Sequence, residues 1–217
     1  MRIAGVAVRV EGTPPEYGEL GAMIAANHVS WLDVFAISAV RSTRFVAKSE
    51  VRDWPLAGWI AERAGTLFIR RERLRDTARI KEEVHAALLQ GDRVGLFPEG
   101  TTTEGDRLLR FHSSLFEAAV ANQAHVHPCA IRYEYADGTL CRAVAYVGEL
   151  SFMQSMARVV AETGVTARIA FGPVVETAGG DRRAVSRECE ARIATLLGLA
   201  APGTAPRTPP GPPGEPP

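Results

Sequence analysis

Short apolar segments alternate with longer helical segments along most of the chain, and this alternation constrains the fold more than any other feature. Apolar runs of about four to eight residues bounded by Gly, Pro or Asp are typical of buried strands. The clearest helix begins at Asp76, a good N-cap, carries Ile80, Val84 and Leu88 on one face, and ends at Gly91. We expect strands over residues 6–10, 22–26, 43–48, 66–70, 93–97, 126–133, 141–147 and 166–171. Further helices are expected over 31–40, 54–64 and 182–197, at the Ser114–Glu117 capping box, and between the last two strands.

Strands that are separated by helices of about ten residues tend to pair in parallel, because the helix carries the chain back to the same edge of the sheet. The chain is therefore predicted to be an α/β protein with a mainly parallel central sheet and helices on both faces. One antiparallel hairpin is expected at Asp137-Gly138. Active groups of such sheets lie where strands end at their carboxyl side, which draws attention to the residues just past 26 and 97.

The length and composition fit one folded domain followed by a short tail. With 217 residues, of which 46% are hydrophobic and 23% charged, the chain can bury a full core. Eight of the fourteen prolines fall within the last eighteen residues, a density that prevents packing. We expect a single domain over residues 1–199 and a Pro-rich disordered tail over residues 200–217.

Positive and negative charges are equal in number over the whole chain, but one segment has an excess of positive charge. Twenty-five Lys and Arg residues match twenty-five Asp and Glu residues, so no overall positive field attracts nucleic acid, and no nucleic-acid partner is expected. Between residues 41 and 75, nine basic residues stand against four acidic ones, a net charge of +5. This excess favours an anionic substrate or a lipid headgroup surface, and a solvated basic face is the simpler alternative.

The cysteines and the apolar runs limit the setting of the protein. Cys129, Cys141 and Cys189 are odd in number and have no metal-ligand spacing, so we expect neither a disulfide framework nor a zinc site. A reducing, cytoplasmic setting fits best. No run of about eighteen apolar residues occurs, and the first thirty residues do not resemble a signal peptide.

The segment Asn27-His28-Val29-Ser30-Trp31-Leu32-Asp33 carries the strongest chemical signal in the chain. It sets an imidazole and a carboxylate five residues apart beside a predicted strand end. A carboxylate that accepts one ring N–H of a histidine fixes its tautomer, so that the other nitrogen can act as a general base. We expect His28 to precede the helix, Ser30 to cap it, and Asp33 to reach back from its first turn. A packed histidine beside a surface carboxylate is the plainer interpretation of the pair alone.

Four blocks together resemble the 1-acylglycerol-3-phosphate O-acyltransferase (phospholipid/glycerol acyltransferase) family. They are Asn27-His28 to Asp33, Gly65-Thr-Leu-Phe-Ile-Arg-Arg71, Phe97-Pro-Glu-Gly-Thr101 and Val126-His-Pro128, in family order over roughly residues 20–135. The resemblance implies a glycerolipid acyltransferase-like fold. It also implies transfer of a fatty acyl group from acyl-CoA or acyl carrier protein to the free hydroxyl of a lysolipid at a membrane surface. No metal or other cofactor is expected.

The resemblance assigns roles to further residues. His28 would be the base and Asp33 its partner. Arg70 or Arg71, with Glu99 and its neighbours Gly100 and Thr101, would bind the acceptor, and Lys48 is a further candidate for the same anion. The position of Pro128 is tied in the family to the acyl donor side, as a wall of the acyl pocket.

One departure from the family pattern leaves the acceptor open. Many members carry an Arg directly after Phe-Pro-Glu-Gly-Thr, whereas Thr102 and Thr103 follow here. The resemblance points first to 1-acylglycerol-3-phosphate, which would give phosphatidate, and a lyso-ornithine lipid is the alternative. A non-catalytic lipid-binding module and a metal-dependent hydrolase are competing classes. Because no Gly-x-Ser-x-Gly elbow or activated cysteine is found, direct transfer without an acyl-enzyme is expected.

The expected location is the cytoplasmic face of a membrane. The protein would be held peripherally, or by an N-terminal segment absent from this chain. The segment Trp54-Pro-Leu-Ala-Gly-Trp-Ile60 is either a core-packed helix or an interfacial element with its Trp rings at headgroup level. The sequence leaves the donor, the acyl chain length and the oligomeric state open.

Overall fold

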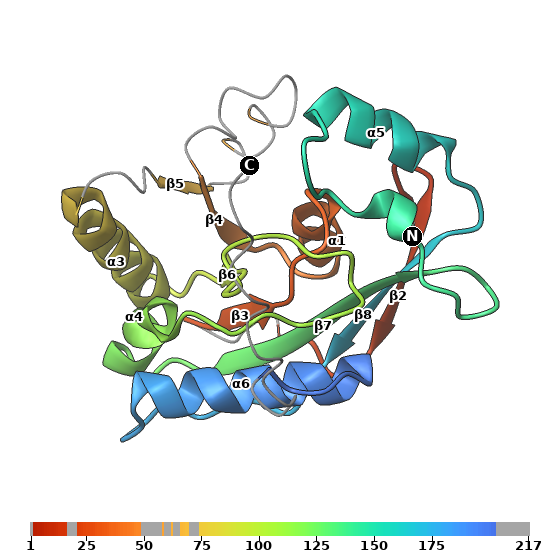
Figure 1. Cartoon of the computed structure of the whole chain (residues 1–217). Helices are drawn as coiled ribbons and strands as arrows, with labels where there is room; N and C mark the ends of the chain where they lie inside the picture. Colours follow the sequence, from red (N-terminus) through yellow and green to blue (C-terminus); the bar gives the residue numbers. More distant parts are fainter. Residues whose placement is uncertain are drawn as a thin grey trace, which may run out of the picture.

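Eight strands form one mixed sheet with the order β1-β2-β8-β7-β3-β6-β4-β5 (Figure 1). The structure, a computed structural model, describes residues 2–16, 21–48, 66–69 and 74–202, together with Gly58 and Glu62. Neighbouring strands pair in parallel except β1 with β2 and β7 with β8, which confirms the predicted α/β sheet. The strands are β1 (Arg2–Ile3), β2 (Val6–Glu11), β3 (Met23–Ala26), β4 (Arg44–Lys48), β5 (Leu67–Ile69), β6 (Val94–Leu96), β7 (Val126–Glu134) and β8 (Thr166–Phe171).

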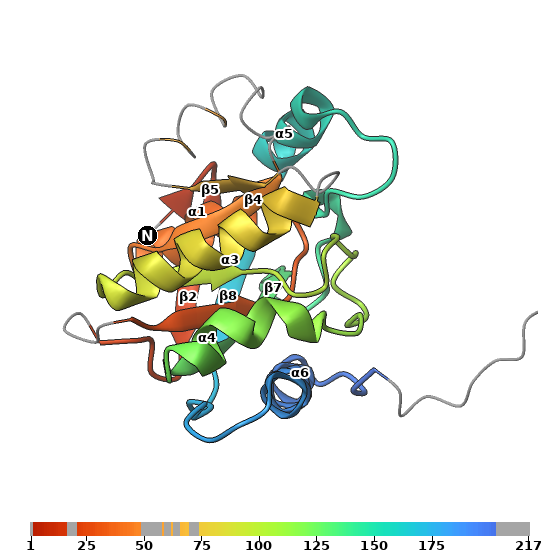
Figure 2. The same cartoon turned by 90° about the vertical axis from the view of Figure 1, so that its left-hand side faces the viewer.

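Helices cover both faces of the sheet, as predicted (Figure 2). Helices α1 (Leu32–Val40) and α5 (Phe152–Ala161) pack on one face, and α3 (Leu74–Leu89), α4 (Glu117–Ala121) and α6 (Arg182–Leu197) on the other. Successive residues of a strand point to opposite faces, so Met23 and Ala25 join one apolar core while Ile24 and Ala26 join the other. This explains why the short β3 contains no polar residue.

The helix ends follow ordinary capping chemistry, at positions that differ in part from those predicted. Ser151 and Gln154 form a reciprocal capping box at the start of α5, and Gly198 ends α6 in the left-handed conformation with φ 67°. The capping box expected at Ser114 is wrong. Ser114 lies inside a short 3₁₀ helix, η2 (Ser113–Phe116), through which the chain enters α4.

The return arm of the predicted hairpin differs from the expectation. The turn at Asp137-Gly138 forms, with φ 83° at Gly138, but the arm pairs with β7 only at Leu140 and then enters η3 (Arg142–Val144). A strand over 141–147 is therefore wrong. The edge of β7 that it would need is taken at Ile131, whose N–H and C=O both bond the side-chain amide of Asn27, at 2.7 and 3.0 Å. The antiparallel neighbour of β7 is β8 instead.

The remaining predicted strands match the observed ones to within one residue at each end. The helix expected over 54–64 lies outside the described residues except for Gly58 and Glu62. Most of the expected tail, residues 203–217, also lies outside them, so the division at residue 199 stays a prediction. Among the helices of the described ranges, none combines the length and hydrophobicity that a bilayer-spanning segment requires.

Candidate active site

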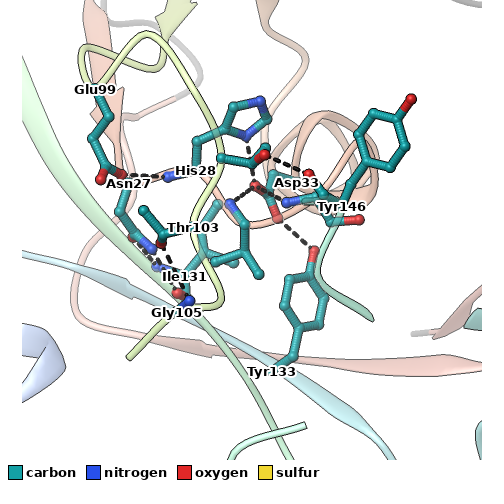
Figure 3. Close-up of polar contacts among 12 residues, drawn as sticks. Asn27, His28, Asp33, Glu99, Thr103, Gly105, Ile131, Tyr133 and Tyr146 are labelled. Atoms are coloured by element: carbon teal, nitrogen blue, oxygen red, sulfur yellow. Dashed lines mark hydrogen bonds and ion pairs between the residues drawn. The ribbon is translucent and has the colours of Figure 1, made fainter. Parts of the chain in front are cut away.

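His28 and Asp33 meet at the carboxyl end of β3, near the middle of the sheet (Figure 3). The strand ends at Ala26, and His28 lies in the short connection before α1. Asp33 belongs to the first turn of that helix and reaches back, so that its Oδ2 lies 2.9 Å from Nδ1 of His28. The structure thus brings together the two side chains that the sequence paired.

Asp33 is completely buried and accepts hydrogen bonds from four donors. Oδ2 accepts the backbone N–H groups of Val29 and Ser30, at 2.7 and 2.9 Å, in addition to the imidazole. Oδ1 accepts the hydroxyl of Tyr133 at 2.7 Å. A buried carboxylate without a cation is stable only when its oxygens are satisfied in this way. The prediction that Ser30 caps α1 is wrong, because Trp31 occupies the N-cap position. The side chain of Trp31 makes no capping hydrogen bond.

Tyr133 is the partner of Asp33 that the sequence did not reveal. It comes from β7, one hundred residues further along the chain, and its side chain is fully buried. Burial, and after it the negative charge and hydrogen bond of Asp33, raises the pKa of Tyr133 well above its ordinary value of 10. The phenol therefore stays protonated and donates a hydrogen bond to Asp33.

The imidazole of His28 is held in one orientation. Asp33 offers only acceptor oxygens, so Nδ1 carries the proton of a neutral ring and Nε2 is left as the basic nitrogen. Nε2 points away from the other labelled side chains (Figure 3), and the His28 side chain is 21% exposed. The ring stacks on Phe97 at 4.0 Å with an angle of 11°, and Phe97 stacks on Phe45.

Glu99 fixes the backbone around His28. Its carboxylate is only 4% exposed and accepts the N–H of His28 and the N–H of Leu109, each at 2.8 Å. Burial raises the pKa of Glu99 from 4.5 to about 7, although the hydrogen bonds from Leu109 and His28 oppose the shift. The C=O of His28 accepts the N–H of Thr103 at 2.9 Å. Binding of the acceptor by Glu99 stays a prediction.

The residues after Glu99 form a compact loop. Gly100 adopts φ 74° and donates its N–H to Phe97 O at 3.1 Å, and Thr101 is exposed. The hydroxyl of Thr102 donates to the C=O of Tyr146. The hydroxyl of Thr103 donates to Arg107 O at 3.3 Å and accepts from Gly105 N at 3.2 Å. Both threonine hydroxyls therefore bond backbone groups, that of Thr102 in the neighbouring segment at Tyr146 and that of Thr103 within the loop.

Comparison with known proteins places the chain in a family. The family model described as Acyltransferase matches residues 7–132. The chain belongs to the acyltransferase family. It is 36% identical over 210 residues to the lyso-ornithine lipid O-acyltransferase of Brucella abortus, covering 90% of this chain and 78% of that protein. It is also 36% identical over 187 residues to the 1-acyl-sn-glycerol-3-phosphate acyltransferase of Neisseria meningitidis, covering 86% and 73%.

A solved structure shows the same fold as this acyltransferase. The 1-acyl-sn-glycerophosphate (LPA) acyltransferase of Thermotoga maritima aligns with a TM-score of 0.63 at 22% identity. The alignment covers 88% of this chain and 72% of that one. The likeness agrees with the glycerolipid acyltransferase-like fold that the sequence predicted.

Of the predicted site residues of the acyltransferase, two lie outside the described part and a third is described only in its backbone. Lys48 ends β4, but its side chain is not described, and Arg70 and Arg71 lie outside the described residues. Pro128 is buried in β7, beside Ala25 of β3. It has no N–H, and it stands where the β7–β8 ladder is interrupted between Phe171 and Val175. Its place on the acyl donor side stays a prediction.

Two further observations bear on the chemistry of the acyltransferase. Within the described ranges, no three His, Cys, Asp or Glu side chains come close enough together to hold a metal ion. A cavity of about 830 Å³ is lined by residues that include Gly12, His125 and Phe171. These residues lie at the amino end of β3 and β7, opposite to His28.

Proposed function

We propose that this acyltransferase moves a fatty acyl group from a carrier thioester to the free hydroxyl of a lysolipid, with His28 as the general base. The observation that carries the proposal is the His28–Asp33 pair, in which Nε2 of His28 points away from the other side chains labelled in Figure 3. The names of the relatives from Brucella abortus and Neisseria meningitidis both describe acyltransferases that act on lipids with one acyl chain.

The proposed reaction transfers one proton and one acyl group. Nε2 of His28 takes the proton of the acceptor hydroxyl while that oxygen attacks the thioester carbonyl carbon. The carbon–sulfur bond then breaks, an ester remains, and the leaving thiolate receives the proton from the imidazolium. Asp33 keeps the ring oriented and stabilises its transient positive charge. A thioester is already activated, so alignment of the two substrates supplies much of the remaining rate.

Direct transfer agrees with the state of the cysteines. Burial raises the pKa of Cys129 far above its ordinary value of 9, and burial raises that of Cys189 to about 12. Cys141 is buried and donates its thiol hydrogen to Tyr135. A thiol that stays protonated is a poor nucleophile, so we expect no acyl-enzyme. Mixing the enzyme with labelled acyl thioester in the absence of acceptor should leave no label on the protein, and a stable adduct would overturn direct transfer.

Two acceptors are proposed, each with its own support. The basic segment from residue 41 to 75, with Lys48, Arg70 and Arg71, favours 1-acylglycerol-3-phosphate. Thr102 and Thr103, whose hydroxyls donate to backbone C=O groups, stand where a cation is expected for a phosphate, and this favours a lyso-ornithine lipid. Replacing both Arg70 and Arg71 with alanine should raise the Michaelis constant of a phosphate acceptor more than that of the donor. No change would remove them from the acceptor site.

The membrane location is part of the same proposal. A lysolipid acceptor and its product partition into bilayers, so the enzyme must reach the lipid surface. We infer peripheral contact at the cytoplasmic face, for which the basic segment 41–75 gives electrostatic support. Sedimentation with anionic vesicles at low and high salt tests it, because electrostatic binding should weaken as salt rises.

The central experiment is an assay of acyl transfer by wild type and His28→Ala. Acyl-CoA and acyl carrier protein donors should be paired with lysophosphatidate and lyso-ornithine lipid acceptors. We expect His28→Ala to lose turnover on the order of a thousandfold, as expected when a general base and its alignment of the hydroxyl are removed. His85→Ala is the matched control, since His85 is exposed on α3. Undiminished turnover in His28→Ala would overturn the assignment.

A further inference from the structure

A small cavity beside the active-site loop has more basic than acidic side chains in its lining. It has a volume of about 140 Å³ and lies between residues 110–113 and the first half of α6. Three arginines line it, Arg110 from the loop and Arg183 and Arg187 from the helix, against a single acid, Glu190. A compact cavity with this excess of positive charge favours an anionic group inside it.

The three arginines of this cavity differ from their neighbours on α6. Arg182 is bonded to Glu117 at 2.6 Å, and Arg192 donates to the C=O groups of Pro173 and Val174. In contrast, the guanidinium groups of the three cavity arginines make no hydrogen bond or ion pair with any residue in the described ranges. The structure thus places three arginines without ion pairs in the described ranges around one space.

Hydroxyl groups complete the lining of the cavity. Ser186 is 4% exposed and lines the cavity, and its hydroxyl has no hydrogen-bond partner in the part of the chain that the structure describes. Ser113 lines the opposite wall. The carboxylate of Glu190 accepts the N–H of Phe111 at 2.7 Å, which holds the loop against the helix. Guanidinium forks together with hydroxyl donors are the groups that recognise phosphate oxygens.

The cavity is joined to His28 by a short series of bonds. One oxygen of Glu99 accepts the N–H of His28 and the other accepts the N–H of Leu109, so these two nitrogens lie within about 8 Å of each other. Arg110 is the next residue after Leu109, and Phe111 is bonded to Glu190 of α6. A ligand seated in the cavity is therefore near the reacting groups without touching them.

The cavity also lies on the opposite side of β3 from the expected acceptor site. In the sheet order, β4 and β5 lie beyond β6 on one side of β3, and Lys48 ends β4. Helix α6 packs against β7, which adjoins β3 on the other side. A reaction between two substrates needs two binding regions that converge on the base. The second anion site therefore fits the donor.

We propose that the cavity binds the phosphate of the pantetheine arm of the acyl donor, the group that coenzyme A and acyl carrier protein share. The inference rests on the proposed function, in which the donor is a carrier thioester. Arg110, Arg183 and Arg187 bind the phosphate oxygens, and Ser186 donates one hydrogen bond. The arm then runs from Arg110 past Leu109 and delivers its thioester to His28. The phosphate undergoes no chemical change.

The test compares two donors that differ only in this phosphate. Acyl-phosphopantetheine and acyl-pantetheine are assayed as donors with wild type, with Arg183→Ala/Arg187→Ala, and with Arg182→Ala as the matched control on the same helix. Wild type and Arg182→Ala should prefer the phosphorylated donor about tenfold or more in kcat/KM. The double variant should lose this preference while the Michaelis constant of the acceptor stays unchanged. Arg110→Ala gives a second variant on a separate element.

Direct binding separates this inference from the proposed function. Calorimetric titration of the enzyme with coenzyme A, without acceptor, should give binding that weakens about tenfold or more in the double variant. If wild type binds coenzyme A in this way but transfers no acyl group, the proposed function fails and the site stands. If transfer occurs and the double variant keeps the donor preference, the site is wrong. Loss of binding to anionic vesicles with an unchanged donor preference would assign the cavity to lipid phosphate and overturn the proposal.

Discussion

Replacing Glu99 with glutamine should change how the stability of the acyltransferase depends on pH. The carboxylate is buried between two backbone N–H donors, those of His28 and Leu109, and its pKa is raised from 4.5 to about 7. Burial is the largest cause of that shift, and it outweighs the two hydrogen bonds. Glutamine has nearly the same shape and no charge, so it removes the titration and retains most of the packing.

The size of the effect follows from proton linkage. Below pH 4.5 the carboxyl is protonated in both the folded and the unfolded chain, and above about pH 7 it is ionised in both. Between these values the folded protein keeps a proton that the unfolded chain has lost, so the free energy of unfolding falls as pH rises. A shift from 4.5 to about 7 corresponds to a loss on the order of 3 kcal/mol across this window.

Glutamine also has a cost that does not depend on pH. It offers one acceptor oxygen for two buried donors, whereas even a protonated carboxyl keeps its hydroxyl oxygen as a second, weaker acceptor, so one backbone N–H loses its partner, at about 1–3 kcal/mol. The variant should therefore be less stable than wild type at pH 4.5. The difference should close, by an amount on the order of 3 kcal/mol, as the pH is raised to 8.

Urea unfolding of both proteins at several values between pH 4.5 and 8 measures this difference directly. The other titrating groups are common to both proteins and cancel in the comparison. Glu149→Gln is the matched control, because it makes the same chemical change at an exposed position. A gap between wild type and Glu99→Gln that stays constant, or that widens as pH rises, would show that the hydrogen bonds outweigh burial and refute the argument.

Two other substitutions test how the imidazole is held. Tyr133→Phe leaves Oδ1 of the buried Asp33 without its donor, so we expect about 1.5–3 kcal/mol less stability in urea and slower turnover. Equal stability would mean that water replaces the phenol. Gly95→Ala would place a Cβ 2.5 Å from the ring of Phe45, which stacks on Phe97 and through it on His28. Turnover should fall and the melting temperature should drop, whereas an unchanged kcat would show that the stack does not position the base.

The architecture could be predicted because its signals are local. Strand and helix periodicity predicted the α/β class and most element bounds, and the five-residue spacing of His28 and Asp33 beside a predicted strand end indicated that the two side chains could meet. Capping at Ser114 and Ser30 failed for a physical reason. A serine with suitable spacing caps a helix only if the helix begins there, whereas α1 begins after Trp31 and Ser114 lies inside η2.

The partners that complete the site could not be predicted because they come from distant segments. Tyr133 is one hundred residues from Asp33, and Glu99 is seventy-one residues from His28. Neither pairing leaves a periodic signal, since each depends on which strands become neighbours in the sheet. The same is true of Asn27, whose bonds to Ile131 also prevented the strand predicted over residues 141–147.

These distant contacts share one origin, the pairing of β3 with β7. Asn27 holds the end of β3 against Ile131, and two positions further along β7 Tyr133 reaches Asp33. Because side chains alternate along a strand, a slip of one residue in this register would turn Tyr133 to the other face of the sheet and leave Asp33 without its fourth donor. The orientation of the proposed base therefore depends on strand register as much as on the local His28–Asp33 spacing. The sequence therefore identifies His28 and Asp33, but the correct pairing of β3 with β7 is required to orient the imidazole of His28.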